Sequence, residues 1–78
     1  MDKSQFLTDI KKIIETESDV ITLDSKFEEI EEIDSLTIMS ICSWLNDKHK
    51  LNIKYADFNK YITLSDLFNE IELQQKNA

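Results

Sequence analysis

Residues 28–36 read EEIEEIDSL and separate two kinds of sequence. Just before them the apolar residues follow no regular period, whereas after them apolar residues recur at helical spacing. We therefore expect Asp34 to cap a helix that runs from Ser35 to about Lys48. The N-terminus of a helix carries unpaired backbone N–H groups and a positive potential. The hydroxyl of Ser35 thus lies where an anionic substituent would be stabilised.

Two more stretches have the apolar spacing of an amphipathic helix. One spans residues 4–17, with Ser4 or Asp2 as its N-cap. The other follows Thr63, which stands three residues before Asp66 in a capping-box-like relation. The predicted apolar stripes, in chain order, are Phe6, Leu7, Ile10, Ile13 and Ile14, then Ile38, Ile41, Cys42 and Leu45, and finally Leu64, Leu67, Phe68 and Ile71.

A long loop at residues 18–33 follows the first helix, and we expect Leu23 and Phe27 to anchor it, with one helical turn at 27–31. A loop of this length is unusual in a compact domain and is often functional. Because the chain has no Gly and no Pro, its turns are expected to use Asn, Asp, Ser and Lys.

A second connection follows the Ser35 helix. Leu51 and Ile53 alternate like an extended segment and lead into a short helix at 56–61, which Phe58 anchors. The tail at 74–78 is polar and is expected to fray. The pattern predicts an all-α fold, a small four-helix bundle with three main helices, one short helix and a long first loop.

The composition limits both size and function. A chain of 78 residues fits one domain, residues 1–78, that buries about 60% of its unfolded surface. It has no room for a deep, water-excluding active site, so we expect a protein that is not an enzyme. The net charge of −7 argues against binding to nucleic acid or anionic membranes and favours partners with basic docking faces.

Cysteine usage and hydropathy suggest a location. The single cysteine, Cys42, excludes an internal disulfide and is expected to be a small buried apolar residue. No apolar run has the length of a membrane span or a signal peptide. We therefore expect a cytoplasmic monomer without membrane insertion. The spacing of a metal site is also absent.

Several short motifs follow one another along the chain. They are Leu23 and Phe27 in the loop, Asp34-Ser35-Leu36, the alternating His49, Leu51 and Ile53, and Tyr61-Ile62-Thr63-Leu64 before the last helix. In this order and spacing they resemble the acyl carrier protein family over almost the whole chain. The resemblance implies that Ser35 carries 4′-phosphopantetheine derived from coenzyme A and that Asp34 helps to present the site.

The resemblance also implies partners. A separate phosphopantetheinyl transferase, using Mg²⁺, would modify Ser35, and the arm would hold an acyl group as a thioester. Acyl-transferring or acyl-activating enzymes of fatty-acid, polyketide or related dedicated pathways would exchange that cargo. Ser35 has no base of its own, because His49 lies about 21 Å further along the same helix. It is therefore not expected to act as a self-activated nucleophile.

Side chains beside Ser35 are candidates for partner docking. Leu36 and Met39 lie off the predicted core stripe and suit an adaptable apolar contact. Glu31 and Glu32, with the two glutamates at 28–29, are placed to steer basic partners.

The chain also departs from the family pattern. Bacterial fatty-acid carriers place acids along the helix after the serine, but this chain has Thr37, Ser40 and Asn46 there, and Asp47 as the one acid. Lys54 and Tyr55 stand where the family commonly has proline. These departures make a dedicated pathway about as suitable as general fatty-acid synthesis.

Two alternatives remain open from the sequence. The first is another kind of carrier, for D-alanyl or other aminoacyl groups or for peptidyl groups. The second is an unmodified helical interaction domain, which would bind partners through Leu36, Met39 and the acidic loop.

Overall fold

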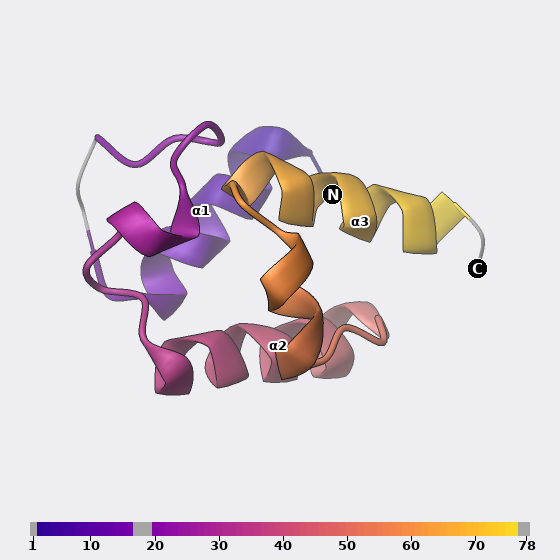
Figure 1. Cartoon of the computed structure of the whole chain (residues 1–78). Coiled ribbons are helices and arrows are strands. Elements are labelled where there is room, and N and C mark those ends of the chain that lie inside the picture. The colour runs from indigo at the N-terminus through magenta and orange to yellow at the C-terminus, as the bar shows by residue number, and fades with distance from the viewer. Residues whose placement is uncertain (1, 17–19, 77–78) are drawn as a thin grey trace.

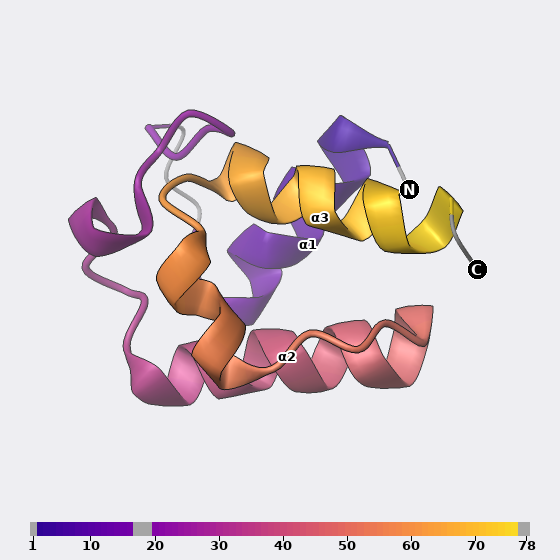
Figure 2. The same ribbon diagram turned by 45° about the vertical axis from the view of Figure 1, so that its right-hand side comes forward.

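The computed structural model describes residues 2–16 and 20–76. Within these ranges the chain forms three α-helices and two short 3₁₀ helices. In chain order these are α1 (Lys3–Ile13), η1 (Phe27–Glu29), α2 (Ser35–His49), η2 (Tyr55–Lys60) and α3 (Leu64–Lys76). In both views α3 and α2 lie on opposite sides, α1 passes behind α3 and slants towards α2, and η2 runs between α2 and the start of α3 (Figures 1 and 2). The predicted all-α bundle of three main helices and one short helix is confirmed.

A single hydrophobic core joins these elements. Its buried side chains are Phe6, Ile10, Ile14, Ile21, Ile30, Ile41, Leu45, Leu51, Ile53, Phe58, Leu64, Leu67, Phe68 and Ile71. The rings of Phe6 and Phe68 join α1 to α3, with their centroids 5.2 Å apart. The predicted stripe of α3 is completely buried, whereas in α2 Ile38 and Cys42 are only partly buried.

Asp2, one of the two predicted caps, is the N-cap of α1. The carboxylate of Asp2 accepts a hydrogen bond of 2.7 Å from the N–H of Gln5. Ser4 lies exposed inside the helix, one residue after its start. The prediction of Ser4 as the cap is therefore wrong and that of Asp2 is right, because a cap must precede the first helical residue.

The end of α1 comes earlier than residue 17, where the spacing placed it. Glu15 adopts a left-handed conformation (φ 56°), and the N–H of Thr16 turns back to the carbonyl of Lys11 at 3.0 Å. This left-handed cap stops the helix without a glycine. Glu17, like Ser18 at the predicted start of the loop, lies outside the described residues.

The first loop is fixed to the start of α3 by its backbone. The hydrogen bonds run from the N–H of Phe27 to the carbonyl of Ile62 (2.9 Å), from Leu64 to Ser25 (3.1 Å) and from Ser65 to Leu23 (2.8 Å). Lys26 and Thr63 form an isolated antiparallel bridge at the same place. The predicted anchors Leu23 and Phe27 pack partly buried against the core. Ile21 and Ile30 are buried more deeply.

The start of α3 carries the predicted capping box. The carboxylate of Asp66 accepts hydrogen bonds from the N–H groups of Thr63 (3.1 Å) and Ile62 (2.9 Å), and the N–H of Asp66 donates to the hydroxyl of Thr63 (3.2 Å). These hydrogen bonds from Thr63 and Ile62 lower the pKa of Asp66 from its ordinary value. The side chains of Thr63 and Asp66 therefore each accept a hydrogen bond from the backbone N–H of the other residue, as expected of this motif.

The end of α3 differs from the prediction. Residues 74–76 continue the helix to Lys76 instead of fraying. One reason is a long-range contact, because the side-chain oxygen of Gln74 accepts a hydrogen bond of 3.1 Å from the N–H of Asn52. The last two residues of the predicted tail, Asn77 and Ala78, lie outside the described residues.

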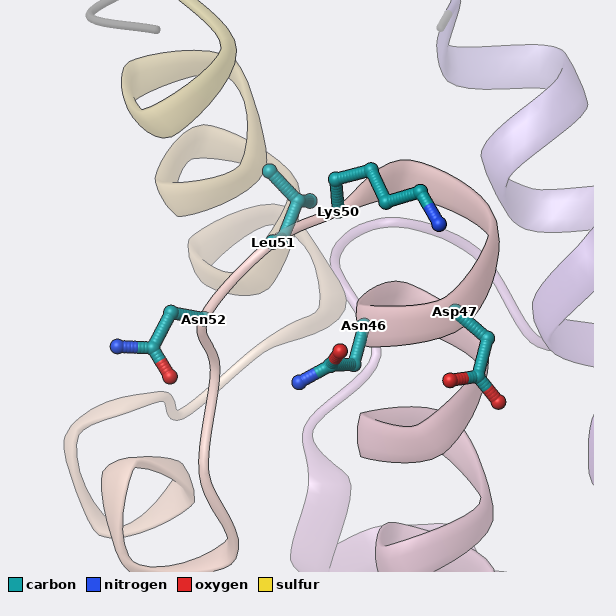
Figure 3. A pocket seen from close by; sticks show the side chains of 5 residues that line it. All are labelled: Asn46, Asp47, Lys50, Leu51 and Asn52. Atoms are coloured by element: carbon teal, nitrogen blue, oxygen red, sulfur yellow. The ribbon is translucent and has the colours of Figure 1, made fainter.

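A left-handed residue also ends α2. Lys50 has φ 56° and ψ 35°, and its N–H bonds to the carbonyl of Asn46 at 3.1 Å. Figure 3 shows this turn, with Lys50 and Asn52 extending in opposite directions. A hollow of about 410 Å³ lies here, lined by Asn46, Asp47, Lys50, Leu51 and Asn52. It lies at the opposite end of α2 from Ser35 and so does not belong to the serine's surroundings.

Lys50→Gly is predicted to raise the free energy of unfolding by about 0.5–1 kcal/mol. A non-glycine residue is strained in the left-handed region by about 1–2 kcal/mol, and glycine removes this strain at some cost in unfolded-state entropy. Urea titration measures the change. Lys48→Gly is the matched control, and it should lower the stability by about 1 kcal/mol because it puts glycine inside the helix. Equal losses in both variants would contradict the prediction.

Candidate functional site

Ser35 is the first residue of α2, and its side chain is exposed. The start of this helix lies at a corner of the molecule in both views (Figures 1 and 2). Asp34 caps the helix as predicted, because its carboxylate accepts a hydrogen bond of 2.9 Å from the N–H of Thr37. The site thus offers a hydroxyl in solvent at the positive end of a helix.

The carboxylate of Asp34 is held in its charged form. The hydrogen bonds from the N–H and the hydroxyl of Thr37 lower the pKa of Asp34 from its ordinary value. The side chain itself is exposed. Its negative charge therefore stabilises the first turn of α2 at neutral pH.

Thr37 links the cap to the loop in front of it. Its hydroxyl lies 2.9 Å from the carboxylate of Asp34 and 3.2 Å from the carbonyl oxygen of Glu32. The one hydroxyl proton is shared between these two acceptors. The contact with Glu32 was not predicted from the sequence, because Thr37 does not have the Glu or Gln side chain of a capping box.

A second residue that sequence reasoning missed reaches Ser35 from another element. Tyr55, the first residue of η2, donates a hydrogen bond from its phenol to Ser35 Oγ at 3.1 Å. The tyrosine side chain remains 49% exposed. The two residues are 20 positions apart, so no local pattern in the sequence predicts the contact.

The predicted docking residues are all on the surface. Leu36 is 74% exposed and Met39 is 55% exposed, both on α2 close behind Ser35. Glu31 and Glu32 are exposed in the loop before Asp34. The structure therefore places apolar and acidic side chains on either side of the serine along the chain.

A mainly apolar groove of about 390 Å³ lies between the loop, α2 and η2. Its lining residues are Phe27, Glu28, Ile33, Ile38, Phe58, Asn59, Tyr61 and Ile62. Ile33 and Ile38 precede and follow Ser35 closely in the chain, so the groove adjoins the helix that carries the serine. Burial, followed by the charges of Glu70 and Asp57, raises the pKa of Tyr61 to about 12. The phenol in this groove is therefore neutral at physiological pH.

The other candidate reactive side chains lie elsewhere. His49 ends α2, and its ring packs edge-on against Trp44 with centroids 5.1 Å apart. Cys42 is half-buried, and burial raises the pKa of its thiol. In residues 2–16 and 20–76, no three His, Cys, Asp or Glu side chains gather as a metal site, and no helix has the length and apolarity to cross a membrane.

Comparison with known proteins gives one match. The family model described as "Phosphopantetheine attachment site" matches residues 4–71. The match begins at the second residue of α1, includes η1, α2 and η2, and ends inside α3. No curated protein and no solved structure matches the chain significantly. The exposed serine at a helix start therefore lies within a segment that has this family's sequence pattern.

Asp34→Asn is predicted to flatten the acid dependence of stability. The pKa of Asp34 is lowered by folding, so its carboxylate contributes fully above the unfolded-state value of about 3.9, and this contribution is lost as the pH falls through the lower folded value. Asparagine caps about as well without a charge. Urea titrations from about pH 5 to pH 2 should show a steeper loss in the wild type than in the variant.

The matched control is Asp24→Asn, which removes an exposed loop carboxylate that caps no helix. Its stability should follow the wild-type pH dependence more closely than that of Asp34→Asn. Parallel curves for the wild type and Asp34→Asn would refute the role of the charged cap.

Proposed function

Because the chain belongs to the phosphopantetheine attachment site family of carrier proteins, we propose that Ser35 carries its prosthetic group and that the chain delivers an acyl thioester to partner enzymes. The family's prosthetic group is 4′-phosphopantetheine, and its members are non-catalytic carriers that a phosphopantetheinyl transferase modifies. Carriage on a flexible arm raises the effective concentration of the cargo at each partner. The observation that carries the proposal is the exposed hydroxyl at the first position of α2.

The residues around Ser35 suit a phosphodiester. The start of α2 favours an anion, and the phenol of Tyr55 provides a hydrogen-bond donor at the serine oxygen. In the proposed modification, Ser35 Oγ forms a bond to the phosphorus of coenzyme A that bears the pantetheine. The bond from this phosphorus to 3′,5′-ADP breaks, and the serine proton passes to a base of the transferase. The arm then supplies the thiol that holds the cargo.

The groove beside α2 favours an acyl cargo over an aminoacyl one. Its walls include the apolar side chains of Phe27, Ile38 and Phe58, which would shelter a hydrocarbon chain from water. An aminoacyl group carries a positive charge that gains nothing from such walls. We therefore place an acyl carrier ahead of a D-alanyl or peptidyl carrier.

The surface of α2 supports a dedicated pathway. The exposed side chains behind Ser35 include Leu36, Met39 and Ser40, and none of these is charged. Acidic side chains instead gather in the preceding loop, including Glu31 and Glu32. We propose that partners contact an apolar ridge formed by Leu36 and Met39 and are attracted by the acidic side chains of the loop. Such partners differ from enzymes that bind acidic side chains along the helix. The single core supports one carrier domain, which we propose acts as a monomer.

Incubation with coenzyme A, Mg²⁺ and a broad-specificity phosphopantetheinyl transferase is predicted to add one phosphopantetheine to the wild-type chain. Mass spectrometry of the intact protein detects the gain, and Ser35→Ala should abolish it. The controls Ser40→Ala and Ser43→Ala remove other exposed hydroxyls of α2 and should still be modified. No gain in the folded wild type would instead favour an unmodified interaction domain.

Glu31→Gln combined with Glu32→Gln is predicted to lower kcat/KM for the transferase several-fold at low ionic strength. Exposed charges act mainly by steering association, so the loss should shrink as salt is raised. Steady-state kinetics at two salt concentrations measure this. Glu70→Gln with Glu72→Gln makes the same charge change on α3 and should have a smaller effect. Equal effects would show that only the net charge matters.

A further inference from the structure

Tyr55 is held where its hydroxyl meets Ser35. The N–H of Lys54 bonds to the carboxylate of Asp57 at 3.0 Å, and the N–H of Asp57 bonds back to the carbonyl of Lys54 at 2.9 Å. One turn later, the buried ring of Phe58 packs edge-on against Phe27, with centroids 5.5 Å apart. The backbone around Tyr55 is thus held by the hydrogen bonds between Lys54 and Asp57 and by the packing of Phe58 on Phe27.

The exposure of Tyr55 shows that its ring is not a core anchor. About half of the side chain is open to solvent, and its hydroxyl makes the hydrogen bond to Ser35 Oγ. In this geometry the phenol donates and the serine oxygen accepts. With the phenol as the donor, the proton of Ser35 is left for an external base.

From this geometry we propose that Tyr55 is a positioning residue of the modification site. Its hydroxyl sets the direction of Ser35 Oγ before modification, and it remains as a donor to the anionic phosphodiester afterwards. This inference rests on the proposed attachment at Ser35. It adds that a second element, η2, takes part in presenting the serine and in holding the base of the arm.

The chemistry of the bond supports both stages. An exposed serine side chain otherwise samples several staggered rotamers, and a hydrogen bond from a fixed donor favours one of them. Once the oxygen bears a phosphodiester, a neutral donor beside it faces a negative charge. Hydrogen bonds to an ionised group are about twice as strong as those between neutral groups, so modification strengthens the contact.

Tyr55→Phe tests the proposal, because it removes the hydroxyl and keeps the ring. With the transferase, coenzyme A and Mg²⁺, kcat should fall about three- to tenfold, the effect of one lost hydrogen bond. KM for the carrier should change little, because Leu36, Met39 and the acidic loop are untouched. Tyr55→Ala should lose about the same factor, and Ser43→Ala, which removes an exposed hydroxyl of α2, should lose none.

Phosphorus-31 NMR of the modified proteins gives a readout independent of rate. The phosphodiester resonance should move in Tyr55→Phe relative to the wild type and stay in place in Ser43→Ala. A wild-type kcat or an unmoved resonance in Tyr55→Phe would overturn the proposal, as would a loss seen only in Tyr55→Ala. Failure of the wild type to be modified, or modification of Ser35→Ala, would instead refute attachment at Ser35.

Discussion

The backbone contact between the first loop and the start of α3 fixes the middle of the segment that leads into Ser35. The first N–H groups of a helix have no partner within it, and in α3 those of Leu64 and Ser65 bond to loop carbonyls. The loop in turn gains a fixed point in its middle, with Ile21 and Ile30 buried on either side. A segment without regular structure over most of its length is thus held in place. The acidic residues and Asp34 come next in the chain, between this fixed point and the start of α2.

The residues that hold α2 in the core differ from those that contact Ser35 and its cap. Ile41 and Leu45 are completely buried and hold α2 in the core. The contacts of Ser35 and its cap are made at the surface by Asp34, Thr37 and Tyr55. These contacts are polar and contribute little apolar burial. A small chain can therefore present an exposed serine without opening its core.

Short-range features of the site and fold were predictable from the sequence. The Asp34 cap and the Thr63–Asp66 capping box depend on residues three apart, and the buried stripe of α3 depends on helical period. The contacts that were not predicted are long-range. The hydrogen bond from Tyr55 to Ser35 and the pairing of the loop with α3 join residues that only the finished fold brings together.

The helix ends show a further limit of the sequence. Because the chain has no glycine, the left-handed positions at the helix ends are taken by Glu15 and Lys50. Lysine was among the residue types expected in turns, but glutamate was not. The early stop of α1 therefore had no local signal. Similarly, the contact of Gln74 with Asn52 extends α3 through a stretch whose composition suggested fraying.

The high exposure of Leu36 and Met39 has an evolutionary consequence. Substitutions at surface positions away from caps and core usually change stability by no more than about 0.5 kcal/mol. Selection can therefore vary these two side chains nearly independently of folding. On the docking role proposed for Leu36 and Met39, a duplicated gene for such a chain would acquire new partner enzymes by substitutions at these two positions, while the inherited scaffold stayed intact.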